Sequence, residues 1–125
     1  MLTSKVGRYT EHRISLLKNL AAQLIEHEII ETTHTKAKVL RPFIEKIITK
    51  GREYVMNQNN NENKHRNVFL FRFMLKHLHN NHKVVKKLIE VISPRLLNRN
   101  GGYTRIILNG FRNGDKANKS LIQIL

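Results

Sequence analysis

The sequence contains no cysteine and no tryptophan, and only nine of its 125 residues are Asp or Glu. Without cysteine there is no disulfide framework and no thiolate metal site. No apolar run approaches the length of a membrane span, and residues 1–13 lack the apolar core of a secretory signal. The only aspartate, Asp115, has no histidine or second carboxylate beside it in sequence. No nucleophile–base pair is therefore indicated, and we expect the chain not to be an enzyme.

Two weak motifs bear on metal or nucleotide binding. His77, His79 and His82 lie close together in sequence, but no cysteine joins them and acids nearby are few. Surface or phosphate-contacting histidines are the interpretation we favour over a metal site. Residues 110–116 have the wrong spacing for a Walker A loop and lack its Ser or Thr after the lysine. The sequence therefore predicts no catalytic residue, no metal and no cofactor.

Positive charge is what the chain has in excess. There are 23 Lys and Arg residues, and the formal net charge is +14. Residues 1–34 are neutral, because four basic residues balance four acids there, so the whole excess lies in residues 35–125. Such a surplus costs stability through self-repulsion, and a polyanionic partner explains it best.

Residues 101–114 are the most informative stretch. They contain a glycine pair, the aromatic Tyr103, Arg105, an apolar run and a second turn with Arg112. Glycines permit close backbone approach, arginines suit phosphate, and an exposed tyrosine ring can stack on a base. This combination favours RNA as the partner. The alternative is a hairpin whose glycines only turn the chain and whose arginines are solvated.

Hydrophobic spacing predicts an α+β fold: about four helices packed on one side of a small mixed sheet, with a C-terminal antiparallel strand pair. We expect one domain over residues 1–125, with a low-complexity polar loop at about 57–67. Thr35 is the predicted cap of the second helix, Pro42 predicts a kink or restart within it, and Gly51 loosens its end. Pro94 is expected to end the last helix. The predicted helices cover residues 10–26, 35–51, 68–79 and 83–92, and the predicted strands cover 28–33, 103–108 and 120–125.

A family resemblance runs in order from about Gly7 to Leu125. The chain resembles the bacterial-type large-subunit ribosomal protein seventeen, and His-Glu-x-Ile-x-Thr-Thr followed much later by Gly-Gly-Tyr-Thr-Arg is its most specific signature. The matching segments are residues 7–8, 12–13, 19–21, 27–33, 35–38, 40–42, 94–95, 99–105 and 110–115.

The resemblance implies a structural protein of the large ribosomal subunit that binds ribosomal RNA near the rim of the nascent-chain exit tunnel. It also implies large-subunit proteins twenty-two and thirty-two as neighbours, with no membrane and no small-molecule substrate. Two of the implied contacts have a structural alternative: Thr35 could serve only to cap its helix, and Tyr103 could pack inward. Of Lys36 and Lys38, only one is expected to reach a phosphate. Carried over by position, the RNA contacts are Arg8, His12, Arg13, Thr35, Lys36, Lys38, Arg41, Arg95, Arg99, Tyr103, Thr104, Arg105 and Arg112.

The chain departs from the family pattern in two places. The family opens with a dense basic run, whereas this chain is neutral through residue 34, and residues 57–67 with the Phe-rich segment after them are atypical. Both departures indicate a ribosome that has drifted, and a mitochondrion is favoured over a bacterial cytoplasm. A free-standing basic DNA- or RNA-coating protein shares the charge argument and stays as the alternative; a basic hydrolase would need a catalytic constellation.

Overall fold

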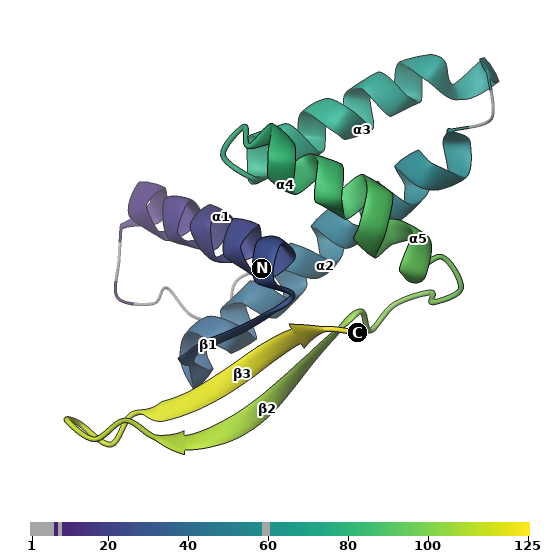
Figure 1. Cartoon of the computed structure of the whole chain (residues 1–125). Coiled ribbons are helices and arrows are strands. Elements are labelled where there is room, and N and C mark those ends of the chain that lie inside the picture. The colour runs from purple at the N-terminus through teal and green to yellow at the C-terminus, as the bar shows by residue number, and fades with distance from the viewer. Residues whose placement is uncertain (1–6, 8, 59–60) are drawn as a thin grey trace.

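Helices fill the first three quarters of the chain and a strand pair closes it (Figure 1). The computed structural model describes residues 7, 9–58 and 61–125, so the predicted RNA contact Arg8 lies outside the described residues. None of the described helices is long and apolar enough to cross a membrane. The elements are α1 (Thr10–His27), β1 (Ile29–Thr33), α2 (His34–Asn57), a 3-10 turn (Asn61–Asn63), α3 (Lys64–His77), α4 (His82–Lys87), a π-helical segment (Leu88–Ile92), α5 (Ser93–Arg95), β2 (Thr104–Phe111) and β3 (Asn118–Ile124).

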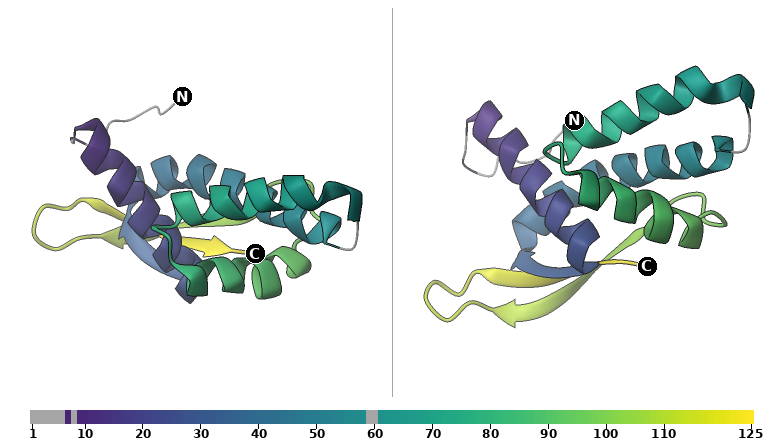
Figure 2. Two further views of the ribbon diagram at one scale, coloured as in Figure 1. Left: turned by 90° about the horizontal axis from the view of Figure 1, so that it is seen from above. Right: turned by 45° about the horizontal axis from the view of Figure 1, so that its top comes forward.

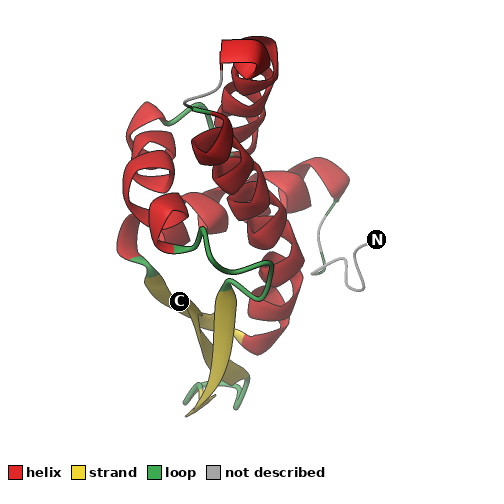
Figure 3. Cartoon of the chain, turned by 90° about the vertical axis from the view of Figure 1, so that its right-hand side faces the viewer, coloured by secondary structure: helices red, strands yellow, loops and turns green. Residues whose placement is uncertain are grey.

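The three strands form one sheet in the order β1-β3-β2. Both pairings are antiparallel, with Gln123 of β3 opposite Ile29 of β1 on one side and Arg105 of β2 on the other. The predicted α+β fold and its C-terminal strand pair are confirmed. The prediction of a mixed sheet is wrong, because β3 returns between β1 and β2 and runs opposite to both. The helices cover one face of this sheet and leave the other uncovered (Figures 1 and 3).

Alternation along β3 separates the two faces of the sheet. Ser120, Ile122 and Ile124 are buried, whereas Leu121 and Gln123 between them are only half-buried. The buried side meets the helices in one apolar core, and burying each large aliphatic side chain contributes about 1.5–3 kcal/mol. The core residues from the helices include Leu24, Ile25, Leu40, Ile44, Ile47, Ile48, Met74, Leu88 and Ile92.

Helix α2 differs from its prediction in three details. Thr33 caps it, because its Oγ1 accepts a hydrogen bond of 3.4 Å from the Lys36 amide, so the predicted cap at Thr35 is wrong. The helix continues past Pro42 without a restart, and that proline is exposed. Gly51 does not end the helix. It is buried where the π-helical segment and α5 approach, and a Cβ there would lie 2.6 Å from the Ser93 hydroxyl.

The middle of the chain is more helical than predicted. Helix α2 ends at Asn57 and α3 begins at Lys64, so residues 64–67 of the predicted polar loop are helical. The last helical stretch continues through Pro94 to Arg95, because proline is tolerated in the first turn of α5. Phe69 on α3 is half exposed, so the Phe-rich stripe is only in part a core-packing face.

Candidate nucleic-acid interface

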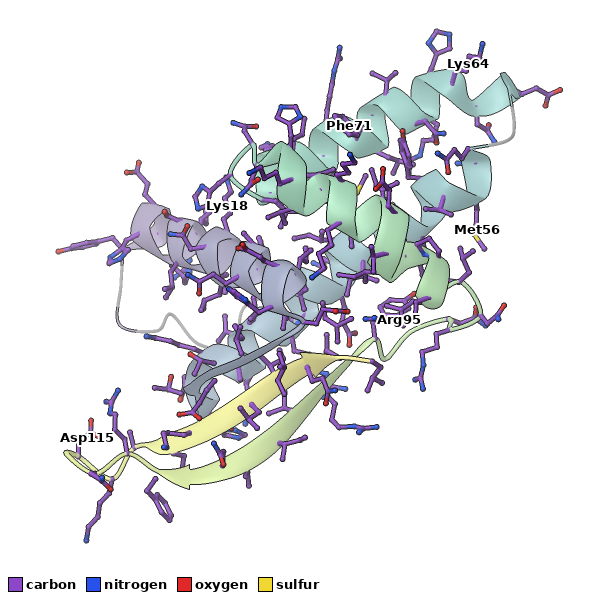
Figure 4. All side chains as sticks on the ribbon, viewed as in Figure 1. Lys18, Met56, Lys64, Phe71, Arg95 and Asp115 are labelled. Carbon is purple, nitrogen blue, oxygen red and sulfur yellow. The ribbon has the colours of Figure 1, made fainter. Side chains whose placement is uncertain are left out.

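The β2–β3 hairpin projects beyond the helices, with Asp115 at its tip (Figures 1 and 4). Arg112 holds Asp115 with two hydrogen bonds, Nε to Oδ1 at 3.0 Å and Nη2 to Oδ2 at 2.6 Å. The Ala117 amide donates a third bond of 3.1 Å to Oδ1. These bonds, the one from Arg112 above all, lower the pKa of Asp115 to about 2. The tip is therefore closed by an ion pair that fixes the direction of the Arg112 side chain.

Beside this hairpin, three cationic side chains from three elements surround one hollow. Lys36 from α2, Arg112 and Lys119 line a volume of about 240 Å³ together with residues 31–33. Glu31 is the only acid among its lining residues, and its Oε1 lies 3.4 Å from Lys119 Nζ. The positive end of the α2 dipole points the same way, since Lys36 is in the first turn. Such a combination of three cations and a helix start suits a phosphate group.

The other predicted contacts at the start of α2 and of α1 lie on the surface. Thr35, Lys38 and Arg41 are exposed, as is His12 on α1, whereas Arg13 is half-buried. Arg41 Nε lies 3.7 Å from Glu45 Oε1, a weak surface pair. The first turn of α1 and the hairpin tip lie toward the same end of the molecule in all three views of Figures 1 and 2. The structure thus gathers predicted contacts from three parts of the chain at one end.

The remaining arginines serve different roles. Arg95 joins α5 to one end of the sheet, where β1 begins and β3 ends. Its Nη2 lies 2.5 Å from Glu28 Oε1, and its Nε donates to the Leu125 carbonyl at 3.1 Å. Arg99 makes only a long bond of 3.5 Å to the Gly102 carbonyl. Arg105 is exposed on the sheet face turned away from the helices and has no hydrogen bond or ion pair within the described chain. Of Arg95, Arg99 and Arg105, Arg105 is therefore the one with the most freedom to bind a partner.

Tyr103 and Thr104 do not offer their side chains to a partner. Tyr103 is 2% exposed, and its hydroxyl accepts a bond of 2.7 Å from Arg52 Nη1. Thr104 is 3% exposed and donates from Oγ1 to Glu45 Oε1 at 3.0 Å. Tyr103 thus takes the alternative of packing inward and Thr104 is held by Glu45, while a role of residues 103–104 as RNA contacts stays a prediction.

Two cationic features were missed by the sequence reasoning. Lys119 stood outside the predicted strand, although the alternation of β3 would have placed it on the uncovered face. The second feature is a stretch, residues 63–89, without any Asp or Glu. It carries Lys64, Arg66, Arg72, Lys76, Lys83, Lys86 and Lys87 on α3 and α4. The absence of acids over residues 63–89 is a local feature of the sequence that could have predicted this cationic surface.

Comparisons with known proteins agree over nearly the whole chain. The sequence profile of the family described as "Ribosomal protein L17" matches residues 16–125. The chain is 46% identical over 123 residues to the large ribosomal subunit protein bL17 of Petrotoga mobilis, covering 98% of this chain and 92% of the relative. The protein of the same name from Fervidobacterium nodosum is 44% identical over 126 residues, with 100% and 96% covered. That of Wolbachia pipientis is 45% identical over 122 residues, with 98% and 78% covered.

Proposed function

We propose that this chain, which belongs to the ribosomal protein L17 family, binds ribosomal RNA through the hollow around Lys36, Arg112 and Lys119 and the adjoining face of the β2–β3 hairpin. It is a structural constituent of the large ribosomal subunit and not an enzyme. The free-standing DNA- or RNA-coating protein is not favoured, because the relatives are named as subunit proteins.

The hollow is the observation that carries the proposal. Its three cations come from β3, the start of α2 and the hairpin turn, so only the folded chain brings them together. Arg105 extends the same charge along the uncovered sheet face. A phosphate backbone crossing the hairpin then meets several donors in succession, with Arg112 already oriented by Asp115.

Salt dependence tests this proposal. The protein is titrated with large-subunit ribosomal RNA transcribed in vitro, and the affinity is expected to fall steeply with salt as counterions are released. Lys36→Ala should lower the slope of log affinity against log salt by about one unit or less. Lys38→Ala should have a smaller effect, since Lys38 does not line the hollow.

Lys18→Ala is the matched control, because it removes one charge from α1 away from the hairpin tip (Figure 4). Its affinity and salt slope should stay near those of the unaltered protein. An affinity indifferent to salt between low and physiological strength would contradict phosphate binding. Equal losses in Lys36→Ala and Lys18→Ala would place the RNA elsewhere.

The position within the subunit is a further part of the proposal and rests on the family resemblance. The chain lies near the outer rim of the exit tunnel, beside large-subunit proteins twenty-two and thirty-two. Lysine crosslinking of purified subunits, followed by mass spectrometry, should link its exposed lysines Lys38, Lys46 and Lys116 to those two proteins. Crosslinks exclusively to other subunit proteins would reject these neighbours.

A mitochondrial ribosome is the setting we propose. The neutral first 34 residues and the asparagine-rich segment 57–67 support it, whereas the relatives compared above are bacterial. Fractionation of a eukaryotic source cell should recover the chain with mitochondrial large subunits. Recovery from a bacterial cell's own ribosomes would reject the mitochondrial setting and leave RNA binding untouched.

A further inference from the structure

Helices α3 and α4 form a second cationic surface, separate from the hairpin. Two of their seven Lys and Arg side chains are already engaged. Arg66 donates to both carboxylate oxygens of Glu53 at 2.8 and 3.3 Å, and Lys87 donates to the Glu26 carbonyl at 2.5 Å. Arg72 and Lys86 are exposed and make no ion pair or hydrogen bond within residues 9–58 and 61–125. This surface has charge that the folded protein does not itself neutralise.

Aromatic rings lie between these free cations. Phe71 of α3 (Figure 4) stands 6.3 Å from the Tyr54 ring of α2 and 6.3 Å from the His82 ring of α4, measured between ring centres. Two hollows flank Phe71, of about 310 and 350 Å³. Arg72 lines the first hollow, and Lys86 lines the second. We call these two hollows and the rings between them the aromatic cleft.

We propose that the aromatic cleft takes an unstacked nucleobase of ribosomal RNA, with its flanking phosphates on Arg72 and Lys86. Each hollow has the size of a small-molecule site, about 300 Å³ or more. Half-buried aromatic rings beside cations are what a splayed-out base requires, since the ring stacks on the base while the cation holds its phosphate. This inference rests on the proposed function and adds a second contact to it.

The charge of the aromatic cleft favours RNA over a second copy of the chain or an apolar protein segment as its occupant. A second copy of the chain would bring the same positive surface and be repelled. Glu90 is the only acid that lines either hollow, so an anionic partner faces little opposition. An apolar protein segment would leave Arg72 and Lys86 unneutralised at its edge, whereas RNA supplies a phosphate on each side of every base.

Ultraviolet crosslinking of the full-length protein on in vitro transcribed large-subunit ribosomal RNA locates the contact directly. Mass spectrometry should find a nucleotide attached to the peptide that carries Tyr54 or the one that carries Phe71. Absence of both adducts, with adducts present on hairpin peptides, overturns the cleft. In purified subunits, crosslinks of these peptides to a protein in place of RNA also overturn it.

Three variants test the energetics. Phe71→Leu keeps an apolar side chain but removes the ring, so RNA affinity should fall about five- to thirtyfold while the salt slope is unchanged. Lys86→Gln removes one charge from an exposed position, so affinity should fall about two- to fivefold and the salt slope should decrease by about one unit or less. Arg66→Gln on α3 is the control and should bind like the unaltered protein, since Arg66 lines neither hollow.

The outcomes separate this inference from the proposed function. If Lys36→Ala weakens binding while Phe71→Leu and Lys86→Gln bind like the unaltered protein, the cleft is rejected and the hairpin interface stands. If none of the three weakens binding, both are rejected. Should Phe71→Leu unfold at the assay temperature, Lys86→Gln and the crosslinked peptides decide, because neither depends on changing the core.

Discussion

Arg52 on α2 donates a hydrogen bond of 2.7 Å to the hydroxyl oxygen of Tyr103, at the entry to β2. It donates a second bond of 2.8 Å to the Leu97 carbonyl. Arg52 is 9% exposed, and no carboxylate of the described chain pairs with it. A buried cation is costly unless its donors are satisfied. These two acceptors satisfy Nη1 and Nη2, whereas the buried Nε has no partner within the described chain. In return, Arg52 ties both ends of residues 97–103 to the core.

Tyr103→Phe should therefore destabilise the protein without weakening RNA binding directly. Removing the hydroxyl leaves Nη1 of a buried guanidinium without its acceptor, which costs about 1–3 kcal/mol of the free energy of unfolding. Thermal unfolding followed by circular dichroism measures this as a lower Tm. Tyr9→Phe is the control, because Tyr9 is 92% exposed. Equal Tm values for the two variants would mean that the Arg52–Tyr103 bond contributes nothing.

Gly102→Val should lower stability through the backbone alone. Gly102 has φ of +60°, and a Cβ there would meet open space, so strain and not a clash sets the cost. A β-branched residue in that conformation costs about 1 kcal/mol or more. Gly101→Val is the matched control, since Gly101 is equally open and does not have a positive φ. Urea unfolding of both variants should show a lower midpoint only for Gly102→Val, and two equal midpoints would exclude the strain.

Gly51→Ala should destabilise although alanine is the better helix former by about 1 kcal/mol. Its Cβ would lie 2.6 Å from Ser93 Oγ and 3.2 Å from Leu88 Cγ, so the Ser93 and Leu88 side chains must shift to admit it. Overpacking of this kind costs about 1–3 kcal/mol. The paired variant Gly51→Ala with Ser93→Ala should recover part of the loss in a denaturant titration. An increase in stability from Gly51→Ala alone would contradict this close packing.

The carboxyl group of Asp115 should titrate at a pH of about 2, below its ordinary 3.8, because Arg112 binds the charged form. The folded-state pKa is lowered, so this pair stabilises the hairpin tip above pH ~4 and is lost as the pH falls through about 2. The chain has a single aspartate, so its carboxyl carbon is followed by NMR without ambiguity. Arg112→Gln should return the midpoint toward 3.8. A midpoint near 3.8 in the unaltered protein would mean that the pair does not persist in solution.

Much of the fold was predictable because its signals are local. The periodic apolar positions of residues 10–26 predicted α1 (Thr10–His27). The β-branched residues just before α2 predicted β1. The errors concern the roles of single residues, such as a helix cap or a glycine, which depend on tertiary contacts. Thr33 and Thr35 are both able to cap, and Thr33 does so because its backbone is still extended and the helix begins at His34. A glycine at position 51 suggested a weak helix end, whereas the Ser93 and Leu88 side chains pack so closely there that they leave no room for a Cβ.

The candidate site was predictable only as a set of charges. Sequence and resemblance supplied Lys36, Arg105 and Arg112, but Tyr103 was assigned to the surface because a burial partner such as Arg52 lies far away in sequence. The hollow beside β3 depends on the register of β1 with β3, which no local pattern contains. Lys119 joins it only through that register.

The most direct test of the central claim is competitive assembly of Arg105→Ala against the unaltered protein into large subunits, scored by the ratio of the two in the purified particle. Arg105 is exposed and unpaired within the described chain, so its loss should leave the Tm of the free protein unchanged. It removes a charge-assisted contact of about 1.5–3 kcal/mol, so the variant should be underrepresented about tenfold or more. Lys18→Ala should compete equally. Equal incorporation of Arg105→Ala and the unaltered protein would contradict RNA binding by this face of the hairpin.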